Sequence, residues 1–152
     1  MINAAYHEQN MREALKLAML AWDAGDVPVG AVIICGGEAV GTGFNKRESS
    51  QNALLHAEIE AIDSACRALK TWRLSDCTLY VTLEPCPMCA GAIINARIGT
   101  VVYGSKDPKA GACGSVIDLF ACPFNHRPEV VRGILEGECS ALLKDFFEKL
   151  RS

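Results

Sequence analysis

The segment LEPCPMCAGA, residues 83–92, contains the feature from which the rest of the fold can be inferred. The β-rich run 78–83 precedes it and mostly small apolar residues follow, which predicts a strand that leads directly into a helix. Pro87 suits the first helical position, because its missing N–H would have no intrahelical partner there. Cys86 and Cys89 then share one side of the first turn, where free N–H groups favour thiolates. Two such thiolates form half of a zinc site, so further ligands must come from elsewhere in the chain.

Length and composition restrict the classes of protein that need to be considered. The chain has 152 residues and a net charge of −3, so we expect a single domain over residues 1–152 without the general basicity of many nucleic-acid binders. The N-terminus lacks the basic-then-apolar pattern of a signal peptide. The longest apolar stretch, 27–35, is interrupted by Pro28 and Gly30 and is too short to cross a bilayer. We therefore expect a cytoplasmic protein that has no membrane partner and keeps its cysteines reduced.

Helical and strand-like periodicities alternate along the chain, which predicts a layered α/β domain. Gly36 and Gly37 lie between two β-rich runs, so the first two strands should form an antiparallel hairpin, and the rest of the sheet should be largely parallel. A short helix is expected near residues 115–120. The principal elements expected are helices that end near residue 24, begin at residue 56, cover 88–96 and cover 139–150, and strands over 29–34, 39–44, 78–83, 100–104 and 129–134.

His56 is the histidine best placed to complete the metal site. It lies two residues before Glu58, near the start of the second expected helix. Together with Cys86 and Cys89 it would provide three zinc ligands and leave the fourth tetrahedral position for water, as catalytic zinc sites do. Glu58 would then act first as a base toward that water and afterwards as an acid toward the departing amine. The pattern His-x-Glu followed by Pro-Cys-x-x-Cys resembles the signature of zinc-dependent nucleobase deaminases.

Each of these motifs, considered alone, also has another interpretation. Cys-x-x-Cys alone is also typical of redox pairs or of one half of a zinc ribbon. A ribbon needs a second pair, which this chain lacks, and a redox pair would leave the positions of His56 and Glu58 unexplained. Cys66 and Cys139 fit apolar helix faces, while Cys113 and Cys122 share one long loop, where a second metal site or a disulfide is the less favoured alternative.

A closer resemblance covers nearly the whole chain and concerns the bacterial tRNA-specific adenosine deaminases. The motifs that carry it are PVGAV at 28–32, GFN at 43–45, HAE at 56–58, LYVTLEPCPMCAGA at 79–92, RI at 97–98, VYG at 102–104, DPKAG at 107–111, NHR at 125–127 and DFF at 145–147. The resemblance implies a three-layer α/β/α fold of the cytidine-deaminase type, with a mixed five-stranded sheet. It also implies a homodimer with one zinc ion per subunit, which converts the wobble adenosine in the anticodon stem-loop of an arginine tRNA to inosine.

The same resemblance implies roles for individual residues. His56, Cys86 and Cys89 resemble the metal ligands, and Glu58 resembles the proton shuttle. Substrate-binding roles are implied for two sets of residues: a base pocket formed by Asn45, Val29 and Ala57, and RNA contacts made by Lys106, Asp107, Lys109, Asn125, His126 and Arg127. By itself Asn45 would be interpreted as an ordinary turn residue, and residues 125–127 could equally brace a loop.

One departure from the family pattern lies directly before the histidine. Relatives usually have Pro-Thr-Ala there, whereas this chain has Ala53, Leu54 and Leu55. Two alternative functions therefore stay open: deamination of a free base or nucleoside of the guanine or cytosine type, and a catalytically silent, zinc-stabilised RNA-binding subunit. The segments 106–111 and 125–127 favour the tRNA substrate, and the intact Glu58 argues against the silent subunit.

Overall fold

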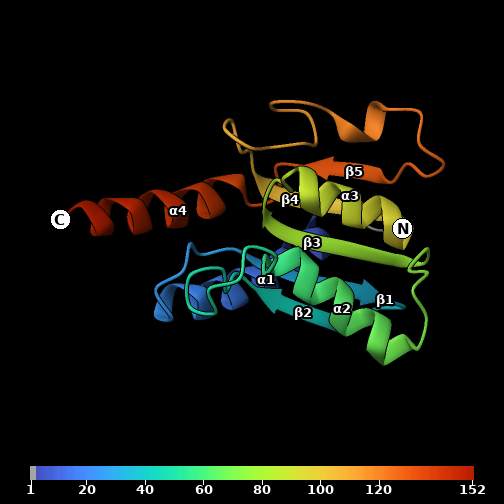
Figure 1. Cartoon of the computed structure of the whole chain (residues 1–152), viewed down its shortest axis with the longest axis horizontal. Helices are drawn as coiled ribbons and strands as arrows, with labels where there is room; N and C mark the ends of the chain where they lie inside the picture. Colours follow the sequence, from blue (N-terminus) through green and yellow to red (C-terminus); the bar gives the residue numbers. More distant parts are fainter. Residues whose placement is uncertain (1–2) are drawn as a thin grey trace.

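The computed structural model describes residues 3–152 and consists of one five-stranded sheet with helices on both faces (Figure 1). Asn3 caps the first helix, because its side-chain oxygen accepts the N–H of Tyr6 at 3.0 Å. The elements in chain order are α1 (Ala4–Asp23), β1 (Gly30–Cys35), β2 (Glu38–Phe44), α2 (Ala57–Leu69), β3 (Cys77–Leu83), α3 (Pro87–Ala96), β4 (Thr100–Ser105), η1 (Leu119–Ala121), β5 (Glu129–Arg132) and α4 (Glu136–Arg151).

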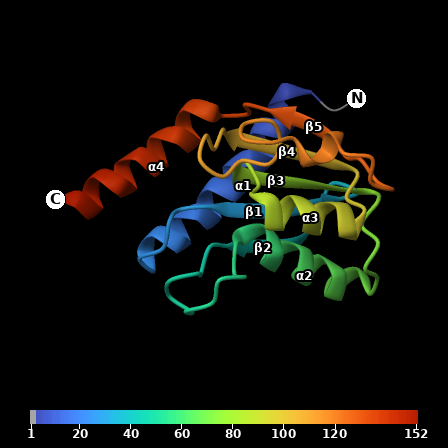
Figure 2. The ribbon, with the colours of Figure 1, turned by 45° about the horizontal axis from the view of Figure 1, so that its top comes forward.

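The strands are arranged in the order β2-β1-β3-β4-β5, and their directions differ in part from expectation. β1 is antiparallel to β2, as the two glycines predicted, but it is also antiparallel to β3. The reason is that α2 returns the chain to the end where β2 began, so β3 runs parallel to β2 yet pairs with β1. Only the β3–β4 and β4–β5 pairings are parallel. The expectation of a largely parallel sheet was therefore wrong, whereas the mixed five-stranded α/β fold is confirmed (Figure 2).

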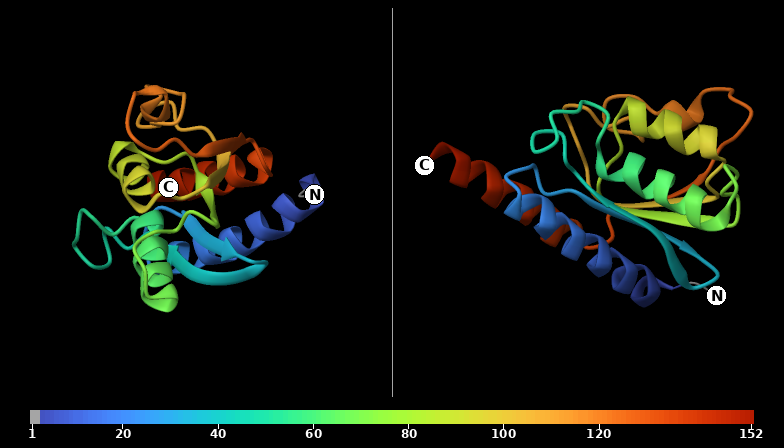
Figure 3. Two further views of the ribbon diagram at one scale, coloured as in Figure 1. Left: turned by 90° about the vertical axis from the view of Figure 1, so that its right-hand side faces the viewer. Right: turned by 60° about the horizontal axis from the view of Figure 1, so that its bottom comes forward.

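Side chains that alternate along the strands form a separate apolar core on each face of the sheet. Val32 of β1 and Tyr80 of β3 are fully buried on the face covered by α1 and α4. Ala31 and Val81, their neighbours in sequence, are buried against α2 and α3. Figure 3 shows α2 and α3 on one side of the sheet and α1 and α4 on the other. The molecule is therefore a three-layer α/β/α arrangement.

Glycine on β2 sets how closely α2 approaches the sheet. A Cβ at Gly41 or Gly43 would overlap the backbone of α2 at Ala61 or Ala57, respectively. Because these two strand residues have no side chain, the helix can lie directly against β2, and its alanines pack in the core. This contact fixes the first turn of α2, which carries His56 and Glu58, at the end of the sheet.

Two elements near the end of the chain differ from the sequence-based expectation. The helix expected near residues 115–120 is instead a short 3-10 turn at Leu119–Ala121, because Asp118 caps the N–H of Phe120 and forms an isolated antiparallel bridge with Cys113. The C-terminal helix α4 is longer than expected, and its last turns extend beyond the sheet (Figures 1 and 2). In the described part of the chain, none of the helices combines the length and the apolar character needed to cross a membrane.

Candidate active site

The histidine and the glutamate of the predicted site both lie at the start of α2. His56 is the residue that precedes the first helical residue, and Glu58 is in the first turn. The loop that precedes His56 ends on an extended backbone, so the imidazole is directed away from the helix axis and toward α3. Glu58 is 4% exposed and has no ion-pair partner in residues 3–152. A carboxylate in such a place needs a functional explanation, because its burial opposes ionisation.

The two cysteines of the predicted site lie at the start of α3, on the opposite side of the pocket. Cys86 precedes the helix, Pro87 occupies its first position as expected, and Cys89 is in the first turn. The Nδ1 atom of His56 lies 3.6 Å from Sγ of Cys86 and 3.5 Å from Sγ of Cys89. All three candidate ligand atoms lie within 4.8 Å of one another. The three side chains therefore converge from two helix N-termini onto one point.

These separations can be compared with the requirements of a tetrahedral zinc ion. With Zn–N near 2.05 Å and Zn–S near 2.3 Å, tetrahedral angles place the nitrogen about 3.6 Å from each sulfur. The two nitrogen–sulfur distances of 3.5 and 3.6 Å agree with this value. One imidazole and two thiolates are also a ligand set that suits Zn²⁺. The residues present therefore fit the metal that the sequence predicted.

The charges at this point favour a bound cation. Hydrogen bonds from Cys89 and His56 lower the pKa of Cys86 to about 4, so this thiol ionises readily. The neighbouring Cys86 thiolate and burial raise the pKa of Cys89, and the contact with Cys86 raises the pKa of His56. These shifts favour a thiolate at Cys86 and protons on the two groups that contact it. A divalent cation would displace these protons, as metal binding to cysteine and histidine generally does.

Burial changes the acidity of Glu58 in the direction that proton transfer requires. Removal from water raises the pKa of Glu58 to about 7, and this effect exceeds the opposing hydrogen bonds and the attraction of His56. A carboxyl group with a pKa near neutrality can both accept and donate a proton at pH 7. A bound cation nearby would lower this value toward the carboxylate form. Glu58 is therefore suited to a proton-transfer role next to the candidate metal ligands.

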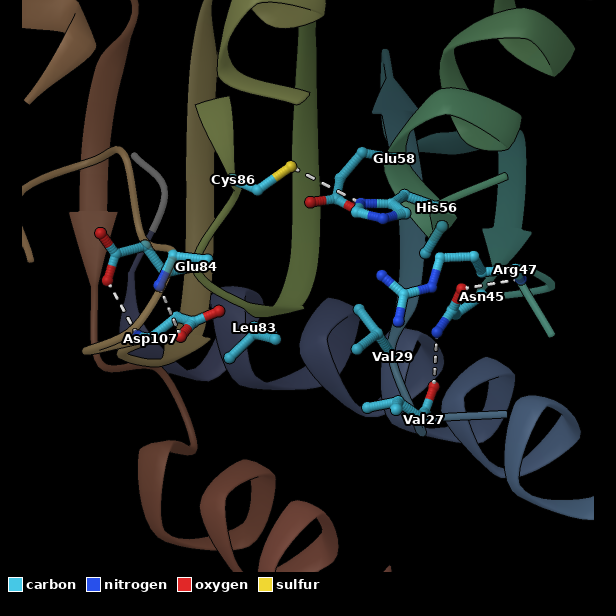
Figure 4. A pocket seen from close by; sticks show the side chains of 12 residues that line it. Val27, Val29, Asn45, Arg47, His56, Glu58, Leu83, Glu84, Cys86 and Asp107 are labelled. Carbon is cyan, nitrogen blue, oxygen red and sulfur yellow. Dashed lines mark hydrogen bonds between the residues drawn. The ribbon is translucent and has the colours of Figure 1, made fainter. Parts of the chain in front are cut away.

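A pocket opens above these residues, and the base-binding residues predicted from the sequence line it. Val29 forms part of one wall, Ala57 lies beside His56, and Asn45 lies at the mouth (Figure 4). The Asn45 amide donates to the carbonyl of Val27 at 3.2 Å, and its oxygen accepts the N–H of Arg47 at 3.1 Å. These two contacts fix the orientation of the amide. One N–H and one lone pair of Asn45 stay free for a ligand.

The opposite wall of the pocket is formed by the loop that follows β4 and contains Asp107. Glu84, which is 2% exposed, organises this loop from below. Its Oε1 accepts the N–H of Asp107 at 3.0 Å and the hydroxyl of Ser115, and its Oε2 accepts the N–H groups of Cys113 and Ser115 at 3.0 and 3.1 Å. Burial alone would raise the pKa of Glu84, but these hydrogen bonds together lower it.

A second buried carboxylate organises the loop on the other side. Asp26 is fully buried and accepts the N–H groups of Glu48 and Ser49 at 2.6 and 3.0 Å. Burial opposes its ionisation, but the hydrogen bonds from these two residues outweigh that effect and lower the pKa of Asp26. The loop between β2 and α2, which carries Arg47 into the pocket, is thus attached to the body of the protein.

The structure brings together only some of the predicted site residues. The group at the pocket comprises His56, Glu58, Cys86, Cys89, Asn45, Val29, Ala57 and Asp107. Lys106 and Lys109 flank Asp107 but are exposed and do not line the pocket. His126 contacts the carbonyl of Ile98 at 2.7 Å, at the end of β4 opposite to Asp107. Within one copy of the chain, Asn125, His126 and Arg127 therefore lie away from the pocket, and their RNA-binding role stays a prediction.

Other residues of the pocket had no role assigned from the sequence. Val27, Arg47, Leu83, Glu84 and Ala110 also line it. Glu84 lies in the motif at 83–92, but its hydrogen-bond partners lie more than twenty residues further along the chain, so the local sequence does not reveal its role. Arg47 carries no motif signal beyond its position two residues after Asn45. Cys113 is buried and Cys122 is exposed, and both are free thiols, so no disulfide joins them.

Comparison with known proteins agrees with the geometry. A sequence model of the family described as MafB19-like deaminase matches residues 5–151. The tRNA-specific adenosine deaminase of Bacillus subtilis is 50% identical over 145 residues, which cover 95% of this chain and 90% of that protein. The protein of the same name from Rickettsia bellii is 46% identical over 93% of this chain and 99% of its own length.

Solved structures give the same result. A structure from a study of A-to-I editing by tRNA:A34 deaminases at the wobble position matches with a TM-score of 0.85 and 41% identity, over 88% of this chain and 98% of that one. A guanine deaminase from Bacillus subtilis matches with a TM-score of 0.65 and 37% identity, over 83% of this chain and 82% of that one. The agreement in length, fold and candidate metal ligands leads to one conclusion: the chain belongs to the family of tRNA-specific adenosine deaminases.

Proposed function

We propose that the protein catalyses the hydrolytic deamination of the wobble adenosine in a tRNA anticodon, which yields inosine and releases ammonia. The observation that carries the proposal is the convergence of His56, Cys86, Cys89 and the buried Glu58 on one pocket. The length-matched similarity to tRNA-specific adenosine deaminases supports the choice of substrate.

His56, Cys86 and Cys89 would hold a zinc ion. When bound, zinc supplies Lewis acidity that makes a water molecule a better nucleophile at neutral pH. Glu58 would carry out the proton transfers. This carboxylate lies beside the ligands and is excluded from bulk solvent, so it can take a proton from the attacking water.

Proton balance assigns Glu58 two successive tasks. As water adds to C6 of the adenine, the proton held by Glu58 is delivered to N1 of the ring, where electron density accumulates. The C6–N bond must then break so that the exocyclic amine leaves as ammonia, and Glu58 can supply the further proton by taking it from the hydroxyl group now on C6, which becomes the carbonyl of inosine. A single carboxyl group with a pKa poised by burial can accept and return protons in both steps.

Asn45 is proposed to hold the adenine in the pocket. Its contacts with Val27 and Arg47 keep the amide in one orientation, and the remaining N–H and lone pair can bond to an acceptor and a donor on a purine edge. Val29 and Leu83 offer apolar surface to the faces of the base. The adenosine must leave its stack in the anticodon loop to reach this depth.

The remaining expectations about partners also belong to the proposal. We expect the substrate to be an arginine tRNA and the protein to work in the cytoplasm as a homodimer. A groove between α2 and α3, lined by Ile62, Cys66, Trp72 and Ala92, supports the dimer, because Trp72 is 55% exposed there in a single copy of the chain. Sedimentation of the wild-type protein and of Ala92→Glu tests this: the wild type should sediment as a dimer and the variant as a monomer.

A second candidate function is the deamination of a free base, which the similarity to a guanine deaminase favours. Purified protein loaded with zinc would be incubated with an anticodon stem-loop that carries a wobble adenosine and, in parallel, with free adenine, guanine and cytosine. We expect ammonia and inosine from the stem-loop alone. Guanine turnover without stem-loop turnover would refute the proposal. If no substrate is turned over, the protein is better explained as a silent RNA-binding subunit.

A further inference from the structure

Among residues 3–152, Arg47 is the permanently charged cation that lines the mouth of the pocket. Figure 4 shows its guanidinium turned toward Val29 and His56, across the pocket from Asp107. In residues 3–152 the side chain of Arg47 makes no ion pair and no hydrogen bond. The neighbouring Lys46, in contrast, is held by Glu60 at 2.8 Å. Among the charged residues that line the pocket in residues 3–152, Arg47 is therefore the one that keeps its donors free for a ligand.

The backbone around Arg47 is held in place before any ligand binds. Its N–H donates to the side-chain oxygen of Asn45 at 3.1 Å, and its carbonyl accepts the N–H of Asn52 at 3.0 Å. The next two N–H groups along the chain are held by the buried Asp26. The only freedom left to order on binding is that of the Arg47 side chain itself, which keeps the entropic cost of binding small.

The depth of the pocket determines what Arg47 can meet. A base that reaches Glu58 and His56 fills the buried part, so its ribose and phosphates stay at the mouth, where Arg47 is exposed. The five donors of a guanidinium match the oxygens of a phosphodiester, often two at a time. The opposite wall presents Asp107 to the pocket, with the buried Glu84 behind it, whereas Lys106 and Lys109 are exposed outside the pocket. The charges of the pocket thus favour a strand whose phosphate lies on the Arg47 side.

We propose that Arg47 binds a phosphodiester group next to the base that occupies the pocket, and thereby makes a polynucleotide strand a better substrate than a free base. This inference rests on the proposed function, since it assumes that an RNA strand delivers the adenosine. It identifies Arg47 as a substrate-binding residue that determines specificity and assigns it no part in the chemical step.

Steady-state kinetics with the stem-loop give the first test. Because the phosphate contact is the same in the ground state and the transition state, Arg47→Gln should raise KM about 10-fold or more and leave kcat within about 2-fold of the wild type. Arg67→Gln is the matched control, since Arg67 lies in the last turn of α2 and is paired with Asp63. This control removes the same charge from the protein and should leave both constants unchanged.

Salt dependence gives the second test. Affinity for a stem-loop that carries the product inosine would be measured between about 50 and 200 mM salt. Loss of one phosphate contact to a single-stranded loop should reduce the slope of log affinity against log salt by about 0.7, and only in Arg47→Gln. An unchanged slope, or a fall in kcat with KM constant, would overturn the proposal, because Arg47 would then act on the base or on the metal ligands.

Replacing single phosphates of the RNA by uncharged linkages identifies the phosphate that Arg47 contacts. Single methylphosphonate linkages would be placed at each position within two nucleotides of the wobble adenosine. At one position the wild type should lose as much affinity as Arg47→Gln, and combining both changes should cost nothing further. Additive losses at every position would overturn the inference while leaving the proposed function intact. Failure of the wild-type protein to deaminate the unmodified stem-loop would instead refute the proposed function, and this inference with it.

Discussion

Glu84 and Asp107 are joined across the floor of the pocket, because a buried carboxylate oxygen of Glu84 accepts the backbone N–H of Asp107 at 3.0 Å. Glu84 is two residues from the candidate metal ligand Cys86, and Asp107 lies on the wall that faces Arg47. One hydrogen bond therefore ties the position of the pocket wall to the strand that leads into the metal site. The loop after β4 is not a free surface loop, since its backbone is held from within the protein.

Replacement of Glu84 by glutamine should destabilise the protein although the size of the side chain hardly changes. Each carboxylate oxygen accepts two hydrogen bonds, at least one of them from a backbone N–H, so in either orientation the amide NH₂ would face a donor that cannot accept. We expect the free energy of unfolding to fall by at least about 2 kcal/mol, measured by urea denaturation. Glu148→Gln, on an exposed part of α4, is the control and should be neutral. An equally small effect for both variants would contradict the role given to Glu84.

Substitution of Gly111 tests the same contact from the loop. A Cβ at this position would overlap the carboxylate of Glu84 and the carbonyl of Asp107, so Gly111→Ala must displace the loop. We expect a loss of about 1–3 kcal/mol in unfolding free energy and a higher KM for the stem-loop. Gly137→Ala is the comparison, because no atom lies within 4 Å of a Cβ there and alanine favours a helix. It should be neutral or stabilising by up to about 1 kcal/mol.

Metal content should separate the ligands from the proton carrier. Cys86→Ala removes one of three ligands, so bound zinc should be lost and the Tm should fall, because metal binding and folding are coupled at such sites. Glu58→Gln should retain zinc but lose at least about 100-fold in kcat. Zinc would be measured by mass spectrometry after gel filtration. Cys122→Ala, which removes an exposed thiol, should keep both zinc and activity. Zinc loss in Glu58→Gln would show that Glu58 is itself a ligand.

The stability contributed by Asp26 should depend on pH in a defined direction. The pKa of Asp26 is lowered in the folded protein, so its contribution is complete above the ordinary aspartate value of about 3.9 and is lost as the pH falls further. At pH 7, Asp26→Asn should be less stable than the wild type by about 1–2 kcal/mol, because one of the N–H groups of Glu48 and Ser49 loses its acceptor. The difference should shrink below about pH 4. Urea denaturation at pH 7, 5 and 3.5 measures it, and a difference that does not change with pH would contradict the assignment.

Local sequence patterns predicted the positions of the helices and strands well, and the directions in which the strands pair less well. Helices and strands were expected within a few residues of their bounds, because the spacing of apolar side chains reflects which face each element buries. The antiparallel pairing of β1 with β3 was missed, since it depends on where the crossover helix α2 places β3 and not on any residue of the two strands. A longer and earlier helix was expected where the structure has the 3-10 turn at 119–121. The turn does not extend toward the N-terminus because Asp118 caps it.

The sequence by itself determined which residues could form a catalytic zinc site: a histidine, two cysteines and a glutamate at a suitable spacing, because ligand identity and helix starts are encoded locally. Only the tertiary structure decided the shape and charge of the pocket around that site. Glu84 and Asp26 hold the pocket loops through backbone N–H groups, which nearly every residue possesses and which therefore leave no signal in a sequence. Arg47, which belongs to no motif, points into the pocket because Asp26 holds the loop that carries it. His126, which belongs to a family motif, lies at the opposite end of β4, where it contacts the carbonyl of Ile98.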